Sequence, residues 1–450
     1  MQLDRAFISR ILVLALPVAL QMLLQSALGM VDVVMVGHLG ATALAAVGLA
    51  AKLHFLLLVL MSGLATSCSV LMAQYLGAKN FAACQRTLAI GLLVGVALML
   101  PFALAAGLAA PIWMSWVNPD PEVIALAAQF MAITAPTLLC TQIIVIYEAG
   151  LRAQGSTGVP LLASAISILV NVVLNYGFIF GHWGLPALGV AGAALGTLIA
   201  RAIHLVCIVT WIYRRHLGFN LSWTEFRRAI DPAEVRKFLR FSAPVLANFT
   251  FWGIGNTCYH AITGFAGTDA LAARGVMVPM ESAFFALFVG MASASAVLVG
   301  RALGADDHAE AWRIRQFFER LAVLLLVVFC SALWLARTPI LQLFAPSPEI
   351  ETLLTHAIGI FCALVWLKIL HMLRIIGVLR AGGDVQFCLI TDLIVMWGLG
   401  IPIYAIVVFG WSHNFVLLYS LMFVEDGLKF LPVLWRVKRG RWVNNLTRST

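Results

Sequence analysis

Charged residues are scarce in this sequence. Asp, Glu, Lys and Arg make up 11% of the 450 residues, whereas hydrophobic residues make up 62%. In a soluble domain, roughly a quarter of the residues are charged and about half are apolar. The composition therefore excludes a soluble globular protein and predicts an integral membrane protein.

Short segments of alternating polar and apolar residues, the pattern of a membrane β-barrel, are also lacking. The chain has long apolar runs instead, each sufficient for a spanning helix of about 20 residues. Examples are 11–36, 88–117, 159–181, 317–336 and 388–410. Counting such runs between polar breaks gives six in each half. We therefore predict an all-α integral membrane protein with twelve transmembrane helices, the first of which is retained and is not a signal peptide.

The motifs of a catalytic or nucleotide-driven protein are absent as well. The longest polar segment, about 214–240, contains no G-x-x-x-x-G-K-[ST] phosphate-binding loop. No nucleophile, base and orienting group occur at a recognisable spacing, and the eight cysteines are scattered without metal-ligand spacing. We therefore expect neither an enzyme nor an ATP-driven pump. Energy would come from an ion gradient, and no organic cofactor is expected.

Basic residues are unevenly distributed. The net charge is +9, and if the amino terminus is cytoplasmic, about 24 of the 29 Lys and Arg residues lie in or beside cytoplasmic segments. These segments include 214–240 and 429–448, the second of which we assign to a cytoplasmic tail. The asymmetry predicts that both termini are cytoplasmic. Topology accounts for the charge, so no nucleic-acid partner is expected.

The sequence also repeats itself. At an offset of 227 residues, 15–78 align with 242–305 without a gap and match at 17 of 64 positions, against roughly 4 or 5 expected by chance. The matches include Pro17 with Pro244 and Gly40 with Gly267. We predict two six-helix lobes, 1–225 and 226–450, arranged as parallel repeats about an axis along the membrane normal. A cavity between such lobes can face either side of the membrane as they rock.

An ionisable residue at the centre of a spanning helix costs about 2.5–3.5 kcal/mol, so each one needs an explanation. The short list of such residues is Asp32, Glu148, Glu281, Lys368 and Asp392. Asp32 follows Pro17 by about 22 Å along the helix and so lies toward the outer half of the membrane. Its repeat counterpart is Tyr259, so the second lobe lacks this acid. The alternative is a structural carboxylate bonded to glycine-rich backbone. For Glu148 and Lys368 we expect pairing or snorkelling near the inner helix ends.

Two asparagines and a threonine are candidate partners of Asp32. Asn171 and Asn175 are four residues apart and lie on one helix face, and Thr197 is in the next predicted helix. Amide and hydroxyl oxygens around a carboxylate suit a hard monovalent cation, such as Na⁺, or a proton held on the buried acid. Paired asparagines also serve as interhelical contacts, which is the structural alternative.

Several short motifs resemble those of one known family of transporters. They are 28–40 (LGMVDVVMVGHLG), 74–78 (QYLGA), 151–155 (LRAQG), 171–175 (NVVLN) and 379–384 (LRAGGD). The chain is similar in these motifs, in register over almost its whole length, to the multidrug and toxic compound extrusion (MATE) family.

The resemblance implies a cation-coupled antiporter of two six-helix lobes that exports organic cations and drugs. It implies that Asp32 is the coupling residue, with Asn171, Asn175 and Thr197 beside it, and that the first helix bends at Pro17. It leaves H⁺ and Na⁺ open as coupling ions. A bacterial inner membrane location and a monomer are expected.

The second lobe departs from the family pattern. Sodium-coupled relatives carry an acid on the seventh helix, whereas 241–263 contains no Asp or Glu. Asp384 matches an acid proposed to bind a cation in the family, although helix capping is an equal alternative. Asp392 and Glu281 are further candidates for protonation or for structural hydrogen bonding.

The main alternative function is a flippase for lipid-linked or polyisoprenoid-linked oligosaccharide, from the same wider superfamily. Such a protein needs a basic central cavity for an anionic headgroup. The main basic candidates within the spans are Arg201, Arg274 and Lys368.

Overall fold

The computed structural model describes residues 5–215, 219–342 and 348–448, and the elements of these ranges are all helices. The first half of the chain forms α1 (Arg5–Gly37), α2 (Ala41–Gly77), α3 (Phe81–Leu108), α4 (Ala110–Ser115), α5 (Pro121–Gln154), α6 (Gly158–Phe180), α7 (Val190–Arg214) and α8 (Trp223–Ala229). The second half forms α9 (Pro232–Gly264), α10 (Thr268–Gly304), α11 (His308–Leu335), α12 (Arg337–Gln342), α13 (Pro348–Arg374), α14 (Val385–Asp392), α15 (Ile401–Gly410), α16 (Phe415–Leu421) and α17 (Val424–Lys438). Two π-helical stretches, η1 (Ile375–Leu379) and η2 (Leu393–Gly400), continue α13 and α14. The all-α prediction is confirmed.

Ten helical segments of the described residues are long and apolar enough to cross a membrane. Helix α9 and the α16–α17 pair supply the other two predicted spans. Helix α9 falls short of that criterion because it is more polar, whereas α16 and α17 have only 7 and 15 residues each. Helix α9 contains amides and hydroxyls such as Asn248 and Tyr259, and α17 contains Glu425, Asp426 and Lys429. With these two, the described residues form the twelve predicted spans.

The chain forms two compact units. Unit 1 comprises residues 1–19, 73–79 and 243–450, and unit 2 comprises 20–72 and 80–242. Two of the boundaries fall close to prolines that the repeat aligns, Pro17 in α1 and Pro244 in α9. Helix α1 is continuous through Pro17. That the lobes 1–225 and 226–450 are the bodies that move stays a prediction.

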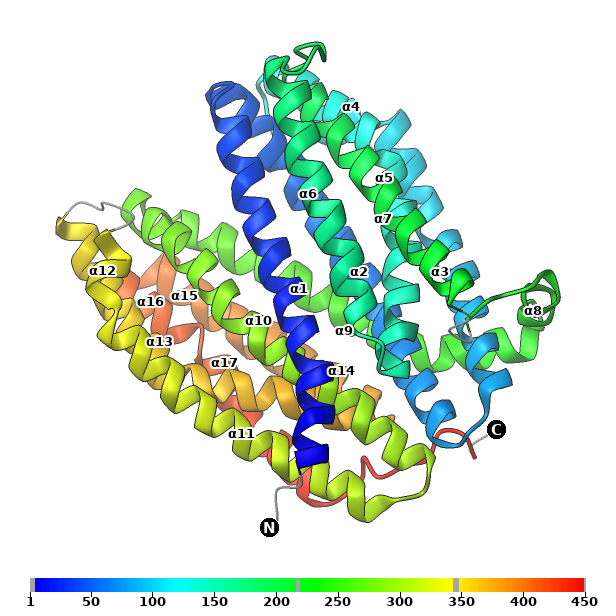
Figure 1. Ribbon diagram of the computed structural model, residues 1–450. Helices are drawn as coiled ribbons and strands as arrows, with labels where there is room; N and C mark the ends of the chain where they lie inside the picture. Colours follow the sequence, from blue (N-terminus) through cyan, green and yellow to red (C-terminus); the bar gives the residue numbers. More distant parts are fainter. Residues whose placement is uncertain (1–4, 216–218, 343–347, 449–450) are drawn as a thin grey trace. The chain divides into compact units, whose positions relative to one another are not determined.

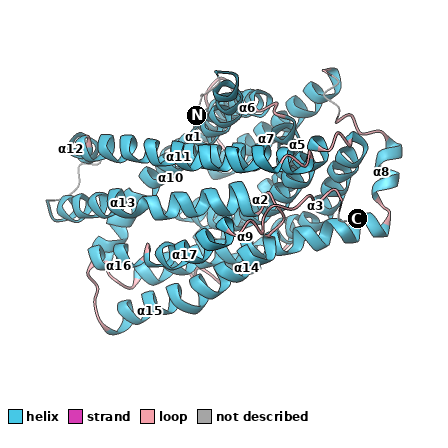
Figure 2. Ribbon diagram, turned by 90° about the horizontal axis from the view of Figure 1, so that it is seen from below, coloured by secondary structure: helices cyan, strands magenta, loops and turns pink. Residues whose placement is uncertain are grey.

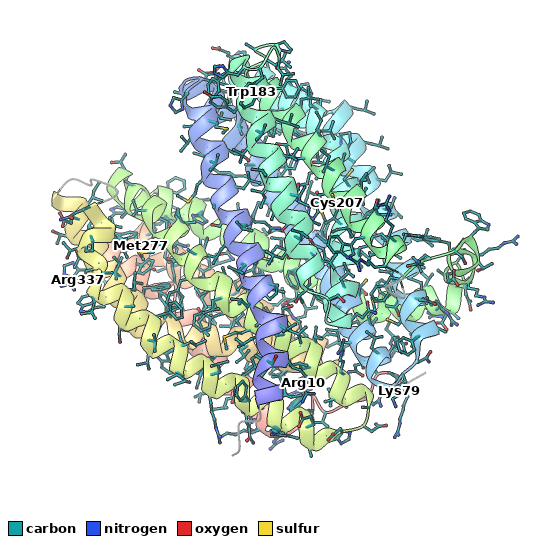
Figure 3. The ribbon with its side chains drawn as sticks, viewed as in Figure 1. Arg10, Lys79, Trp183, Cys207, Met277 and Arg337 are labelled. Carbon is teal, nitrogen blue, oxygen red and sulfur yellow. The ribbon has the colours of Figure 1, made fainter. Side chains whose placement is uncertain are left out.

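Unit 2 is held together by the packing of α3, α5, α6 and α7, which lie side by side in Figure 1. Its core contains small and flexible side chains, including Ala127, Met99 and Met131. The loop between α6 and α7 carries Trp183, labelled in Figure 3. This packing places α6 and α7 against each other, and they carry three of the predicted site residues.

Unit 1 has a core built around α10, α11 and α13, which pack against one another (Figure 2). Aromatic rings interlock there, as in the edge-to-face pair of Phe284 and Phe361, whose centroids are 5.0 Å apart. Such a geometry follows from the ring quadrupoles. The rest of the unit, α14 to α17, holds a group of buried charges described below.

The repeat is visible in the backbone as well as in the sequence. Gly40 and Gly267, each of which immediately precedes the second helix of its half, have φ of 109° and 113°. Lys79 and Asp306, also 227 residues apart, both adopt left-handed conformations with φ of 57° and 59°. The residues that follow them cap α3 and α11: Asn80 accepts from Ala83 N, and Asp307 accepts from Glu310 N. The duplication therefore preserved the local geometry and not only the residue types.

Two glycines related by the repeat let the ends of α2 and α10 touch within unit 1. A Cβ at Gly77 would fall on the main-chain carbonyl of Arg301, and a Cβ at Gly304 would fall on that of Gln74. Residues 74 and 301 are themselves repeat counterparts, so the contact is symmetric. Glycine is required at both positions because the two backbones meet directly.

Candidate cation-binding site

The four residues predicted around the coupling acid are brought together in unit 2 by α1, α6 and α7. Asn175 Nδ2 donates to Asp32 Oδ1 (2.9 Å) and to Asn171 Oδ1 (3.2 Å). Asn171 Nδ2 donates to Thr197 Oγ1 (3.3 Å). Thr197 in turn donates to the Ala193 carbonyl (2.9 Å). Asp32 is bonded to a side-chain amide, so the alternative of a carboxylate held by glycine-rich backbone is not what the structure shows.

A Gly-x-x-x-Gly stretch in α7 explains how these side chains come within reach. A Cβ at Gly192 would fall on the Phe178 carbonyl of α6, and one at Gly196 would fall on the Asn175 side chain. Small residues at this spacing let membrane helices approach closely. Thr197 follows Gly196 directly, so the close crossing positions its hydroxyl against Asn171.

A small cavity opens beside the cluster, within the same unit. Its volume is about 70 Å³, and its lining includes Asp32, Asn171, Thr197, Arg201 and His204. A single water needs about 10–15 Å³ of such space, so the cavity accommodates an ion together with water.

The oxygen atoms of the cluster fit a hard cation. Asn175 Oδ1 is buried and accepts no hydrogen bond from the described part of the chain. Asp32, Asn171 and Thr197 line the cavity together, and they supply the carboxylate, amide and hydroxyl oxygens that hard cations prefer.

A second polar group in unit 2 surrounds Glu148 on α5. Gln21 Nε2 donates to Glu148 Oε1 (2.8 Å), and Arg152 pairs with its other oxygen (3.3 Å). His204 Nε2 lies 3.6 Å from Oε1. The expectation that Glu148 is paired is confirmed. Arg201 interacts electrostatically with both Asp32 and Glu148 and links the two groups. His204 and Gln21 were missed, because a lone His or Gln in an apolar helix gives no spacing signal.

Each of the three second-lobe candidates is paired with a basic residue of unit 1. Arg274 Nη1 donates to Glu281 Oε1 (2.6 Å), to which Tyr419 also donates (2.6 Å). Arg436 donates twice to the Asp384 carboxylate, at 2.6 and 2.9 Å. Asp384 stands at the start of α14, but its side chain makes no capping bond. The capping alternative for Asp384 is therefore wrong, since its carboxylate is engaged by α17.

Asp392 belongs to a buried cluster of charges. Lys429 Nζ pairs with Asp392 Oδ1 (2.7 Å) and with Glu425, while Asn248 Nδ2 donates to Asp392 Oδ2 (2.6 Å). Tyr259 donates to Glu425 Oε2 (3.1 Å). The assignment of Lys429 to a cytoplasmic tail is wrong, because the residue is only 2% exposed. Its neighbours on α17 are polar, and hydropathy alone does not separate such a helix from a tail.

The comparisons with known proteins agree with this architecture. The family described as MatE matches residues 17–177 and again 244–406, two segments whose starts are 227 residues apart, the offset of the repeat. The chain belongs to this family of membrane transporters.

Individual proteins support the assignment. The chain is 27% identical to the probable multidrug resistance protein NorM of Agrobacterium fabrum, over 87% of this chain and 85% of that protein. It is 26% identical to the probable multidrug resistance protein NorM of Thermotoga maritima, over 87% and 83%. The fold superposes on an outward-facing multidrug resistance MATE family transporter with a TM-score of 0.87 and 19% identity, covering 96% of each chain.

Proposed function

We propose that this transporter is an antiporter that couples entry of H⁺ or Na⁺ to export of organic cations and drugs. The observation that carries the proposal is the environment of Asp32. The carboxylate is bonded to Asn175 beside a polar cavity, and no Lys, Arg or His nitrogen of the described residues lies within 4.0 Å of it. Glu281, Asp384 and Asp392 of unit 1 have ion-pair partners, so Asp32 is the acid best placed to accept an external cation.

The substrate class is proposed from the relatives, which are named as multidrug resistance proteins. Coupling requires that the ion and the drug bind two conformations of the protein with different affinity. Binding of the ion at Asp32 from outside would favour the conformation that releases the drug outward. Asn171, Asn175 and Thr197 would hold the ion, and Pro17, which lacks a main-chain N–H, is the proposed bending point of α1.

Both termini are proposed to be cytoplasmic, in a bacterial inner membrane. The lobes 1–225 and 226–450 are the bodies proposed to move, and the active form is a monomer. The flippase alternative would need a basic cavity. Arg274 is paired with Glu281, and Lys368 lies over the Phe285 ring (5.4 Å). Arg201 lines the small cavity of unit 2, but it shares that cavity with Asp32, with which it interacts electrostatically.

The test is uptake of a fluorescent organic cation into inverted vesicles, with H⁺ and Na⁺ gradients imposed separately. We expect one gradient to drive uptake by the native protein, and Asp32→Asn to abolish it at normal expression. Asp120→Asn, at an exposed helix cap, is the matched control and should transport normally. Gradient-driven uptake by Asp32→Asn at the native rate would refute the role of this acid.

A further inference from the structure

The buried cluster of unit 1 has the make-up of a cation site, but a lysine already lies in it. Lys429 contacts one oxygen of Asp392 and one of Glu425. The other oxygen of each carboxylate is held by a neutral donor, Asn248 on Asp392 and Tyr259 on Glu425. The Lys429 ammonium is therefore coordinated by two carboxylates, and the second oxygen of each carboxylate is held in place by its neutral donor. The carboxylates around a bound metal cation are held in the same way.

The repeat shows how this cluster relates to unit 2. Asn248 aligns with Gln21, and both amides donate to a buried carboxylate of their own unit. Tyr259 aligns with Asp32. Where unit 2 has an acid without an ion-pair partner among the described residues, unit 1 has a neutral hydroxyl that donates to Glu425.

The charges of the cluster balance without any added ion. Three carboxylates, Asp392, Glu425 and Asp426, are each less than 9% exposed. Three basic groups face them: Lys429 directly, Arg380 through Asn248, and Lys368, which interacts electrostatically with Asp426. His371 also faces Lys429 and Asp392. A further cation entering this cluster would meet no uncompensated charge.

We propose that the Lys429 ammonium is a built-in cation of unit 1. It occupies the oxygen cluster of Asp392 and Glu425 that would otherwise take an alkali cation or a small ammonium ion. Unit 1 therefore binds no coupling ion. If the proposed antiport is added, one cation site per transporter remains, at Asp32. Only this last consequence rests on the proposed function.

The first test removes the lysine. In Lys429→Ala, two buried carboxylates lose their counter-ion and a space of lysine size opens between them. We expect Na⁺ and methylammonium to raise the thermal midpoint of the purified variant above its value in choline chloride at equal ionic strength, increasingly with concentration. All variants carry Asp32→Asn in addition, which removes the proposed site of unit 2. In that background the protein with Lys429 intact should show no such difference, and neither should Lys429→Arg or Lys438→Ala, an exposed lysine of the same helix. Adding Asp392→Asn to Lys429→Ala should remove the effect.

The second test measures sodium binding directly. Its first arm leaves the cluster intact and so does not depend on the folding of the lysine variant. Binding of ²²Na⁺ to Asp32→Asn should be absent, and Lys429→Ala in that background should bind about one equivalent. Sodium binding by Asp32→Asn that disappears on Asp392→Asn would overturn the proposal, as would a folded Lys429→Ala without any cation-specific response. Both readouts measure binding, so a failure of drug transport would refute the proposed antiport and leave this inference standing.

Discussion

Replacing Gly196 by alanine tests whether the close crossing of α6 and α7 builds the candidate site. The new Cβ would fall on the Asn175 side-chain oxygen and would lie 3.1 Å from the Asn175 main-chain nitrogen. Either the helices separate or the Asn175 side chain turns away, and both changes break its bond to Asp32. The perturbation is a single methyl group at a position that does not itself touch the carboxylate.

The magnitude follows from two terms. Overpacking costs about 1–3 kcal/mol, and the lost hydrogen bond to a charged group costs about 1.5–3 kcal/mol. We therefore expect a loss of roughly 2.5–6 kcal/mol of stability, together with at least a tenfold loss of gradient-driven uptake.

The assay is thermal unfolding of the purified protein together with vesicle uptake. Gly48→Ala is the matched control, because Gly48 lies in α2 of the same unit and a Cβ added there would have nothing within 4 Å of it. This variant should leave stability and uptake unchanged. Native behaviour of Gly196→Ala in both measurements would refute the view that the glycine crossing sets the site.

Two further substitutions probe other contacts. Glu148→Ala should lower the free energy of unfolding by about 3–5 kcal/mol, because it leaves Arg152 without its buried partner. Denaturation of the purified variant measures this free energy, and a change below about 1 kcal/mol would contradict the buried pairing. Gly304→Ala should cost about 1–3 kcal/mol, because its Cβ falls on the Gln74 carbonyl. Gly275→Ala is the control, because a Cβ added there would have open space around it. If Gly304→Ala and Gly275→Ala changed the thermal midpoint equally, the steric explanation would be excluded.

The helical class and the site of unit 2 were predictable from the sequence because both depend on signals that are local or shared with a family. Long apolar runs define spans, and the spacing of Asn171 and Asn175 places both on one helix face. The grouping of these two with Asp32 came from the family resemblance, and the structure confirms that the residues are in contact.

The charge cluster of unit 1 was not predictable in the same way. Lys429 is paired with Asp392, 37 residues earlier in the chain, and no periodic signal links them. The polar residues of α17 also lower its hydropathy, so the segment looks like a tail. Arg436 and Asp384 illustrate the same difficulty, since their pairing depends on how α14 and α17 pack in three dimensions.

The symmetric contact of Gly77 and Gly304 bears on the origin of the chain. The same glycine of each repeat meets the same carbonyl of the other repeat. This is the geometry of an isologous interface, in which a patch binds its own copy across a two-fold axis. In a single six-helix ancestor this contact would form between the two subunits of a homodimer, and fusion of two copies would place it within one polypeptide. Two fused copies can then carry different residues at the same place, as this chain does with Asp32 and Tyr259.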